Sequence, residues 1–225
     1  MNIVTVRDRG LMEEGGFGEL SEGDILIAGF GTTDDFNYMS EFVGKTEDLK
    51  RYVRLSGEKK IVLIAATVSR LFGKSYRTAI VVHKGNILGV SDQTHKTRTE
   101  LTLGNSLKLY ETDCGKLGIL LGEDIFFPEC ALALTEAGAD RLIYLTELEF
   151  QKSADAVLKA SAIFCGLNIA AVFKDATVEY GLRGSRNIID DKAVAVVENS
   201  LKKDVRYMKN RRPSVWRSVT VIQKS

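Results

Sequence analysis

The stretch Gly115–Asp140, GKLGILLGEDIFFPECALALTEAGAD, joins a strand to a helix through a tight corner. Its run LGILLG, at 117–122, has the unbroken apolar character of a strand that is covered on both faces. Pro128 suits the first turn of a helix, and we expect that helix to end at Gly138. The apolar strand Arg141–Thr146 follows at once. This part of the chain therefore predicts a strand–helix–strand unit with parallel strands.

The alternation of strands and helices extends in both directions from this unit. Further strands are predicted at Ile3–Val6, Asp24–Phe30, Ile61–Val68 and Asn168–Phe173, and helices at 36–52 and 154–165. Two β-hairpins are also predicted, one at 78–91 around Lys84-Gly85-Asn86 and one at 187–197 around Asp191-Lys192. Parallel units together with hairpins indicate an α/β protein with mixed sheets rather than a purely parallel, doubly wound sheet.

Composition and charge exclude several classes of protein. The 225 residues are 44% hydrophobic and 27% charged, which is typical of a soluble globular protein, and we expect one continuous domain, 1–225. The 31 basic and 30 acidic residues leave a net charge of +1, which favours neither nucleic acid nor an anionic membrane as a partner. No segment reaches the roughly 18 consecutive apolar residues that a membrane helix needs.

The cysteines favour a reducing compartment. Cys114, Cys130 and Cys165 are odd in number, form no C-x-x-C pair, and accompany two histidines in the whole chain. We therefore expect no disulfide framework, no zinc site and no other cofactor. The start, MNIVTVRDRG, lacks the apolar stretch of a signal peptide, so we expect a cytoplasmic protein.

The quoted stretch resembles the central motif of the carbon–nitrogen hydrolase (nitrilase) family. In that motif a Gly-Lys pair and an apolar strand lead to Cys-x-Asp, then Phe-Pro-Glu, a helix and Gly-Ala-Asp. Ten positions agree without a gap: Gly115, Lys116, Gly118, Asp124, Phe127, Pro128, Glu129, Gly138, Ala139 and Asp140. KGNILGVSDQTHK, KASAIFCGLNIAAV and GSRNIIDDKAVAV resemble the family's flanking hairpins and helix, so the resemblance covers roughly residues 20 to 200.

The resemblance implies a four-layer α-β-β-α sandwich that commonly pairs into dimers. We expect the first helix to be shortened or absent, because about seventeen residues separate the first strand from Asp24 and they include Gly10, Gly15, Gly16 and Gly18. By the same resemblance, the tail 201–225 packs on a dimer partner, and it carries one candidate strand, Ser218–Ile222.

The family's activity depends on three residues, a cysteine nucleophile, a glutamate base and a lysine that stabilises negative charge. The nucleophile position is Gly122, which has no side chain. The base position, aligned on Asp24, is Phe30, whose ring accepts no proton. The lysine position, two residues before His95, is Gln93, which carries no charge.

Neighbouring residues do not obviously replace this triad. Asp34 and Asp35 follow Phe30 closely, but a turn and a helix N-cap before Phe36 explain them better. Lys96 is three residues from Gln93, and strand alternation turns it to the other face. We interpret all three cysteines as small buried apolar residues.

Four residues near the corner remain as pocket candidates: Glu123, Asp124, His95 and Phe127. Asp124 and Phe127, with Pro128 and Glu129, are explained by building the corner, whereas Glu123 points either into the old pocket or into solvent. Gly122 suits a strained strand-to-helix turn and keeps that turn without the reagent.

Three functions fit these residues. The first is a catalytically inactive protein of this fold that acts as a binding or regulatory subunit, as a homodimer or with an active relative. The second is a carbon–nitrogen hydrolase with altered chemistry, in which Glu123, Asp124 and His95 move protons, Gln93 donates a hydrogen bond and water attacks. The third is a scaffold with a filled pocket. The first two predict a small-molecule ligand.

Overall fold

Two β-sheets form the centre of the molecule. The computed structural model describes residues 1–96, 101–190, 193–198 and 201–204. Among these, one sheet has the strand order β13-β1-β2-β4-β5-β6, with β3 paired to β4, and the other has the order β12-β11-β10-β9-β8-β7. The first contains β1 Asn2–Val6, β2 Ile25–Ala28, β3 Phe36–Asn37, β4 Val62–Leu71, β5 Lys74–His83, β6 Asn86–Asp92 and β13 Val194–Glu198. The second contains β7 Leu109–Thr112, β8 Gly115–Leu121, β9 Arg141–Leu145, β10 Ile169–Val172, β11 Thr177–Tyr180 and β12 Arg186–Asp190.

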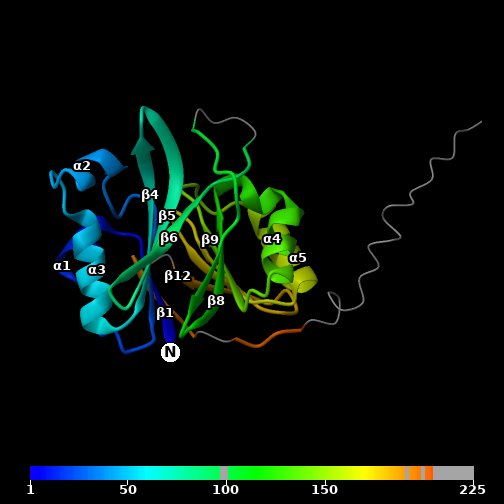
Figure 1. Cartoon of the computed structure of the whole chain (residues 1–225). Helices are drawn as coiled ribbons and strands as arrows, with labels where there is room; N and C mark the ends of the chain where they lie inside the picture. Colours follow the sequence, from blue (N-terminus) through cyan, green and yellow to red (C-terminus); the bar gives the residue numbers. More distant parts are fainter. Residues whose placement is uncertain (97–100, 191–192, 199–200, 205–225) are drawn as a thin grey trace, which may run out of the picture.

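Helices cover the outer face of each sheet (Figure 1). On the first sheet lie α1 Arg9–Glu14, α2 Tyr38–Phe42 and α3 Asp48–Lys59, and on the second lie α4 Pro128–Glu136 and α5 Lys152–Cys165. One apolar cluster fills the space between the sheets, and one lies under each helical layer. Both sheets are mixed, so the predicted four-layer α-β-β-α sandwich with mixed sheets is confirmed.

The unit at Gly115–Asp140 folds as its sequence predicts. β8 and β9 pair in parallel, with α4 as the connection between them. Gly118 explains how closely α4 approaches the sheet, because a Cβ there would lie 2.8 Å from Leu142 and 3.1 Å from Leu134. A short 3₁₀ helix, η1 Gly122–Phe126, makes the corner between β8 and α4.

The predicted helix at 36–52 is wrong. Phe36 pairs with Ser69 of β4, and the side chain of Asn37 caps the N-terminus of α2. The chain leaves α2 through Gly44, whose φ of +70° no helix accepts, and a second helix, α3, begins at Asp48. The apolar residues interpreted as one face of a single helix belong to two separate short helices, α2 and α3.

The predicted hairpin at 187–197 is also wrong. β12 pairs with β11 in the second sheet, whereas β13 pairs antiparallel with β1 in the first. The connection therefore crosses between the sheets, and its turn residues Asp191 and Lys192 lie outside the described residues. The hairpin at 78–91 is confirmed, with Gly85 at a φ of +81°.

The remaining differences concern the ends and the short strands. The first helix is shortened, as predicted, to the six residues of α1, capped by Asp8 and ended at Gly15. The sequence interpretation missed β7 and β11. The segment 201–204 lies next to the end of α5, on the side of the second sheet. There the backbone N–H of Asp204 donates to the carbonyl of Gly166 at 2.9 Å, and Lys203 pairs with Asp140. The candidate strand Ser218–Ile222 lies outside the described residues.

Candidate functional site

Gly122 occupies the turn at the carboxyl end of β8. Its φ is +53°, a conformation in which a side chain is strained, so glycine suits this position for the reason the sequence suggests. The hydroxyl of Tyr144 on β9 donates to the carbonyl of Gly122 at 2.9 Å and fixes the turn. Burial raises the pKa of Tyr144 to about 12, with a contribution from the nearby Asp124 and Glu123 carboxylates, so this phenol stays protonated. Glu123 itself is half-buried at the corner.

Asp124 ties the corner to the end of the β5–β6 hairpin. Its Oδ1 accepts hydrogen bonds from the backbone N–H groups of Thr94 and His95, at 2.9 and 2.8 Å, and from the Thr94 hydroxyl at 2.9 Å. Its Oδ2 accepts from the backbone N–H of Leu121 at 3.3 Å. Burial raises the pKa of Asp124, and these hydrogen bonds partly offset that effect. The carboxylate thus has a structural partner on each oxygen.

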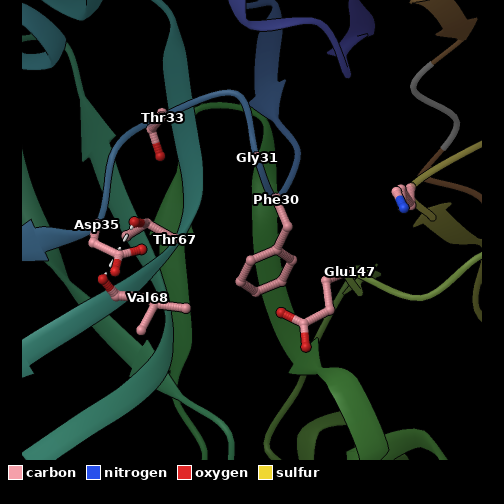
Figure 2. Close-up of a pocket in the computed structure, with 8 residues that line it drawn as sticks. Phe30, Gly31, Thr33, Asp35, Thr67, Val68 and Glu147 are labelled. Atoms are coloured by element: carbon pink, nitrogen blue, oxygen red, sulfur yellow. Dashed lines mark hydrogen bonds between the residues drawn. The ribbon is translucent and has the colours of Figure 1, made fainter.

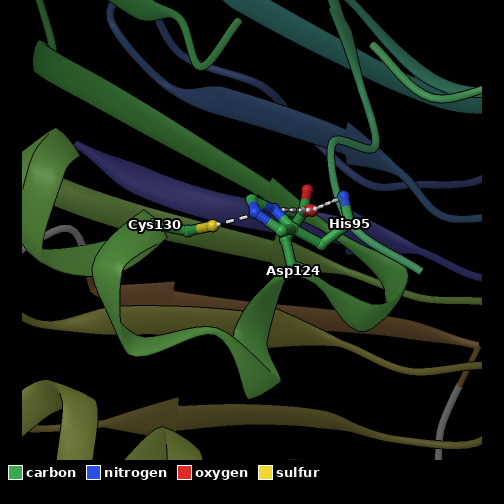
Figure 3. Close-up of side chains that lie close together, drawn as sticks. All are labelled: His95, Asp124 and Cys130. Atoms are coloured by element: carbon green, nitrogen blue, oxygen red, sulfur yellow. Dashed lines mark hydrogen bonds and ion pairs between the residues drawn. The ribbon is translucent and has the colours of Figure 1, made fainter. Parts of the chain in front are cut away.

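His95, Asp124 and Cys130 come together at this corner (Figure 3). Nδ1 of His95 lies 3.3 Å from Sγ of Cys130 and 3.5 Å from Oδ1 of Asp124, while the ring stacks on Phe127 at 4.4 Å between centroids. A nucleophilic triad needs one ring nitrogen on the nucleophile and the other on the carboxylate. Here both groups contact the same nitrogen, so the arrangement is not that of a triad.

The same three side chains offer nitrogen, sulfur and oxygen to a metal ion, a donor set that zinc accepts. The hydrogen bonds already made to Asp124 satisfy its oxygens without a metal. Burial raises the pKa of the Cys130 thiol to about 11, whereas a metal ligand must be a thiolate. We interpret the cluster as a packed corner, as the sequence interpretation did for Asp124 and Phe127.

Gln93 meets a residue that the sequence interpretation missed. Arg77 on β5 is 6% exposed, and its Nη1 donates to Oε1 of Gln93 while its Nη2 pairs with Glu147. The amide nitrogen of Gln93 donates to the carbonyl of His95. A Cβ at Gly122 would lie 2.8 Å from Nη1 of Arg77 and 2.9 Å from Cδ of Gln93. Arg77 and Gln93 therefore occupy the space beside Gly122.

One signal in the sequence identifies Arg77. It lies two and four residues before Ala79 and Val81 on β5, which are completely buried between the sheets. Side chains two residues apart share a face of a strand, so Arg77 also points inward. Glu147 follows the carboxyl end of β9, where the parallel strands of the sheet bring polar residues together. No motif of the resemblance includes either residue.

Phe30 follows β2 and packs at the edge of the cluster between the sheets. Its ring centroid lies 6.0 Å from Cζ of Arg77, within the range of a cation–π contact. Beyond the ring is an open hollow of about 370 Å³ (Figure 2), with Thr67 and Val68 on one side and Phe30 and Glu147 on the other. The three triad positions thus surround a filled centre, and a hollow remains next to it.

The other acidic and basic candidates form bonds outside this centre, and one of them, Asp35, lines the hollow next to it (Figure 2). Asp34 binds Arg9 through two hydrogen bonds, at 2.6 and 2.7 Å, and Asp35 pairs with Arg70 at 2.5 Å. Neither caps a helix, which corrects the expected N-cap, because Asn37 has that role. Lys96 is exposed and donates to the carbonyl of Leu101 at 2.7 Å.

A sequence model of the carbon-nitrogen hydrolase family matches residues 24–180, which is more than half of the chain. The chain belongs to this family. The carbon–nitrogen hydrolase motif at Gly115–Asp140 lies within the matched range, together with all three triad positions. The resemblance stated from the sequence is therefore confirmed.

Known relatives agree with this assignment. The chain is 27% identical over 148 residues to the probable nitrilase C965.09 of Schizosaccharomyces pombe, which covers 62% of this chain and 54% of that protein. This chain therefore spans about half the length of that curated relative.

Two solved structures share the carbon–nitrogen hydrolase fold. A carbon-nitrogen hydrolase from Helicobacter pylori G27 has a TM-score of 0.74 at 18% identity, covering 96% of this chain and 97% of the other. A mutant of the amidase from Nesterenkonia sp. AN1, with an acetamide moiety added covalently at its active site cysteine, has a TM-score of 0.72 at 16% identity, covering 96% of both chains. None of the helices in the described part of the present chain has the length and apolar character needed to cross a membrane.

Proposed function

We propose that this carbon–nitrogen hydrolase homologue does not perform the thiol-dependent hydrolysis of amides or nitriles and acts as a binding or regulatory subunit. The observation that carries the proposal is the filled space beside Gly122. A nucleophilic side chain there would need the volume that Arg77 and Gln93 occupy, with Nη1 of Arg77 only 2.8 Å from its Cβ. A side chain at position 122 therefore requires Arg77 and Gln93 to move.

The other two triad positions support the same conclusion. Phe30 offers no proton acceptor, and its ring contacts the Arg77 guanidinium instead. Gln93 has both ends of its amide engaged, the oxygen with Arg77 and the nitrogen with the His95 carbonyl. It carries no positive charge, and at least one of its two N–H groups is already used, so it is a poor replacement for a lysine that stabilises a developing negative charge. Loss of a nucleophile alone costs on the order of 10⁶ in turnover in a serine protease.

Cys130 does not supply the missing thiol in this proposal. It is 1% exposed, and burial raises its pKa to about 11, so the reactive thiolate is rare at neutral pH. The amidase from Nesterenkonia sp. AN1 has an active site cysteine, whereas the position that the motif assigns to it here is Gly122.

One experiment tests this function. The purified protein is incubated with short amides, nitriles and N-carbamoyl compounds, and ammonia release is measured. We expect no release above the blank. Release that Gly122→Ala, Glu123→Gln or Cys130→Ser abolishes would overturn the proposal, with Cys114→Ser as the matched control for a buried cysteine remote from the corner. Loss in Glu123→Gln alone would favour the hydrolase with altered chemistry.

That alternative rests on one observation, the position of Glu123, Asp124 and His95 at a single corner. Asp124 accepts four hydrogen bonds from the protein, and the groups nearest to Nδ1 of His95 are Cys130 and Asp124 of the same corner rather than an open cavity. The carboxylate of Glu147 is the acidic group at the filled centre, and it is paired with Arg77, so a water nucleophile would have to displace that pair to reach a base. We therefore prefer the binding function.

The hollow beside Phe30 is the place where this function would hold a small molecule. Its volume of about 370 Å³ is within the lower part of the range for ligand sites. A thermal-shift screen with carboxylic acids, amides and nucleotides tests it, because a ligand of the folded state raises the melting temperature by mass action. A null screen would favour the scaffold function.

We also propose a cytoplasmic homodimer, without nucleic acid or membrane as partners. Of the tail 201–225, the first four residues contact their own chain, so the proposal places only the part beyond Asp204 on the partner. The three buried free cysteines fit a reducing compartment. Sedimentation equilibrium of the full chain and of a chain ending at Asp204 tests the assembly. A monomer in both would contradict the dimer, and an unchanged dimer in the shorter chain would contradict the role of the tail.

A further inference from the structure

A second hollow lies on the outer face of the first sheet, behind the filled centre. Its volume is about 290 Å³, and its lining includes Tyr38, Ser69, Tyr76, Asp92 and Asn105. Asp92 directly precedes Gln93 on the chain, and Thr78 directly follows Arg77. Because consecutive strand residues face opposite sides of a sheet, Arg77 and Gln93 point inward while their neighbours Thr78 and Asp92 point to the outer face, where Asp92 lines the hollow. The two regions are back to back and have different walls.

A chain of buried hydroxyl groups holds the Asp92 carboxylate in place. Ser69 and Thr78 are 1% and 0% exposed, and their hydroxyl oxygens lie 2.6 Å apart. The Thr78 hydroxyl donates to Oδ1 of Asp92 at 2.6 Å, so the Ser69 hydroxyl donates to Thr78. These three residues lie on neighbouring strands, β4, β5 and β6, whose pairing fixes their positions. The carboxylate is therefore preorganised before any ligand arrives.

No cation neutralises this carboxylate within the part of the chain that the structure describes. The lysine and arginine ion pairs of that part involve other acidic residues, and Oδ1 of Asp92 is bonded only to Thr78. A carboxylate that is fixed in place, with no cation paired to it among the described residues, is a suitable counter-ion for a cationic ligand. The charge of Asp92 also contributes, after burial, to the raised pKa of Tyr38, which keeps that phenol neutral.

The walls of the hollow suit an organic cation. Tyr38 and Tyr76 provide aromatic surface, which attracts ammonium groups. Gly104 lets the segment 101–105 lie directly on β6, because a Cβ there would be 2.8 Å from Cβ of Asp92. Two backbone hydrogen bonds hold this segment, from Gly104 to Gln93 at 2.8 Å and from Thr102 to Ser75 at 2.7 Å. The wall next to the carboxylate is thus built from ordered backbone.

We propose that this hollow binds a small organic cation, an ammonium group with a short hydrocarbon arm, with Asp92 as its counter-ion and Tyr38 and Tyr76 as its aromatic walls. Its volume of about 290 Å³ suits a small molecule. The site is separate from the region around Gly122, so it does not depend on whether the protein hydrolyses anything.

Isothermal titration of the full chain with n-butylammonium chloride tests the proposal, with 1-butanol as the neutral probe and potassium chloride at equal ionic strength as the salt control. We expect saturable binding of the ammonium salt alone. Asp92→Asn keeps the hydrogen bond from Thr78 but removes the charge, and we expect it to weaken binding at least tenfold, whereas Asp113→Asn, at an exposed carboxylate paired with Lys84, leaves binding unchanged.

A second variant protects the test against misfolding of the first. Tyr76→Leu keeps bulk but removes the ring, and we expect it to weaken binding severalfold, while Tyr76→Phe retains it. Tetramethylammonium chloride, which has no N–H donor, separates the aromatic contribution from hydrogen bonding to Asp92. The absence of saturable binding to both ammonium salts, equal binding of 1-butanol, or unchanged affinity in a folded Asp92→Asn protein would overturn the proposal.

Discussion

The guanidinium of Arg77 occupies the space beside Gly122, where an added Cβ would lie 2.8 Å from Nη1 of Arg77 and would force that side chain to shift. We therefore expect Gly122→Ala to lower the free energy of unfolding through two effects, a strained φ of +53° and a clash. Gly15→Ala is the matched control, because Gly15 has a φ of +75° and no atom within 4 Å of its Cβ. Urea unfolding should give a cost about 1–3 kcal/mol larger for Gly122→Ala than for Gly15→Ala. Equal costs would mean that Arg77 and Gln93 do not fill the space.

Glu147 balances the buried charge of Arg77. The Arg77 side chain is 7% exposed and that of Glu147 44% exposed, so Glu147→Gln leaves a buried guanidinium without its carboxylate. We expect a loss of about 1–2 kcal/mol in the free energy of unfolding, less than for a fully buried pair because water reaches Glu147. Glu149→Gln is the control. Its pair with Lys174 is exposed on both sides and spans 4.0 Å, so its removal should change stability by less than about 0.5 kcal/mol.

Arg141 and Glu179 form an ion pair that predicts how stability changes with pH. Burial raises the pKa of Glu179 from its ordinary value of 4.5 to about 7 and lowers that of Arg141, so the fold disfavours the ionised pair. Between pH 4.5 and 7 the folded chain holds a proton at Glu179 that the unfolded chain releases. This contribution to stability is complete below pH 4.5 and is lost as the pH rises through 7.

The measurement is urea unfolding of the wild type and of Glu179→Gln at pH 5 and pH 7.5. The difference between the two proteins isolates this residue from other titrating groups. The wild type should lose on the order of 2 kcal/mol more than the variant over this interval. Glu111→Gln, at an exposed carboxylate paired with Lys116, should behave as the wild type does. A variant that loses as much as the wild type would contradict the assignment.

The three cysteines should be unreactive in the folded protein. Cys114, Cys130 and Cys165 are each 1% exposed, and burial raises the pKa of Cys114 and Cys130. With 5,5′-dithiobis(2-nitrobenzoate) at pH 8, we expect the protein thiols to react, and thionitrobenzoate to be released, only as fast as the protein unfolds. In denaturant the reaction should become rapid. Fast reaction of one thiol in the native protein that is absent in Cys130→Ser would identify an activated Cys130. That result would argue against the proposed binding function.

The local parts of the fold follow from the sequence, and the long-range pairings do not. The corner at Gly122–Pro128 can be predicted because its signals are adjacent in the sequence: an apolar strand, a glycine that takes a positive φ, and a proline at the start of the helix. The partner of β13 is not: the run at 193–197 suits a hairpin with β12 as well as pairing with β1, and only the completed sandwich selects β1. The same limit explains the false helix at 36–52, where Phe36 joins β4.

The candidate site divides in the same way. The triad positions Phe30, Gln93 and Gly122 could be named in advance because a motif anchors each of them. Strand alternation could place Arg77 between the sheets but not beside Gln93, which lies 16 residues later and meets it only through the pairing of β5 with β6. Asp92 was overlooked for a different reason: its partners Ser69 and Thr78 lie on other strands, and hydroxyl residues in strands are common.

The buried guanidinium of Arg77 also bears on how such a chain evolves. If cysteine replaces Gly122 first, its side chain clashes with those of Arg77 and Gln93. If lysine replaces Gln93 first, its ammonium group lies next to the guanidinium of Arg77, and the two positive charges repel. Removing Arg77 first leaves Glu147 without its partner. Each of these three first steps toward a cysteine–glutamate–lysine enzyme therefore lowers stability, so the buried arginine opposes the return of the cysteine and the lysine.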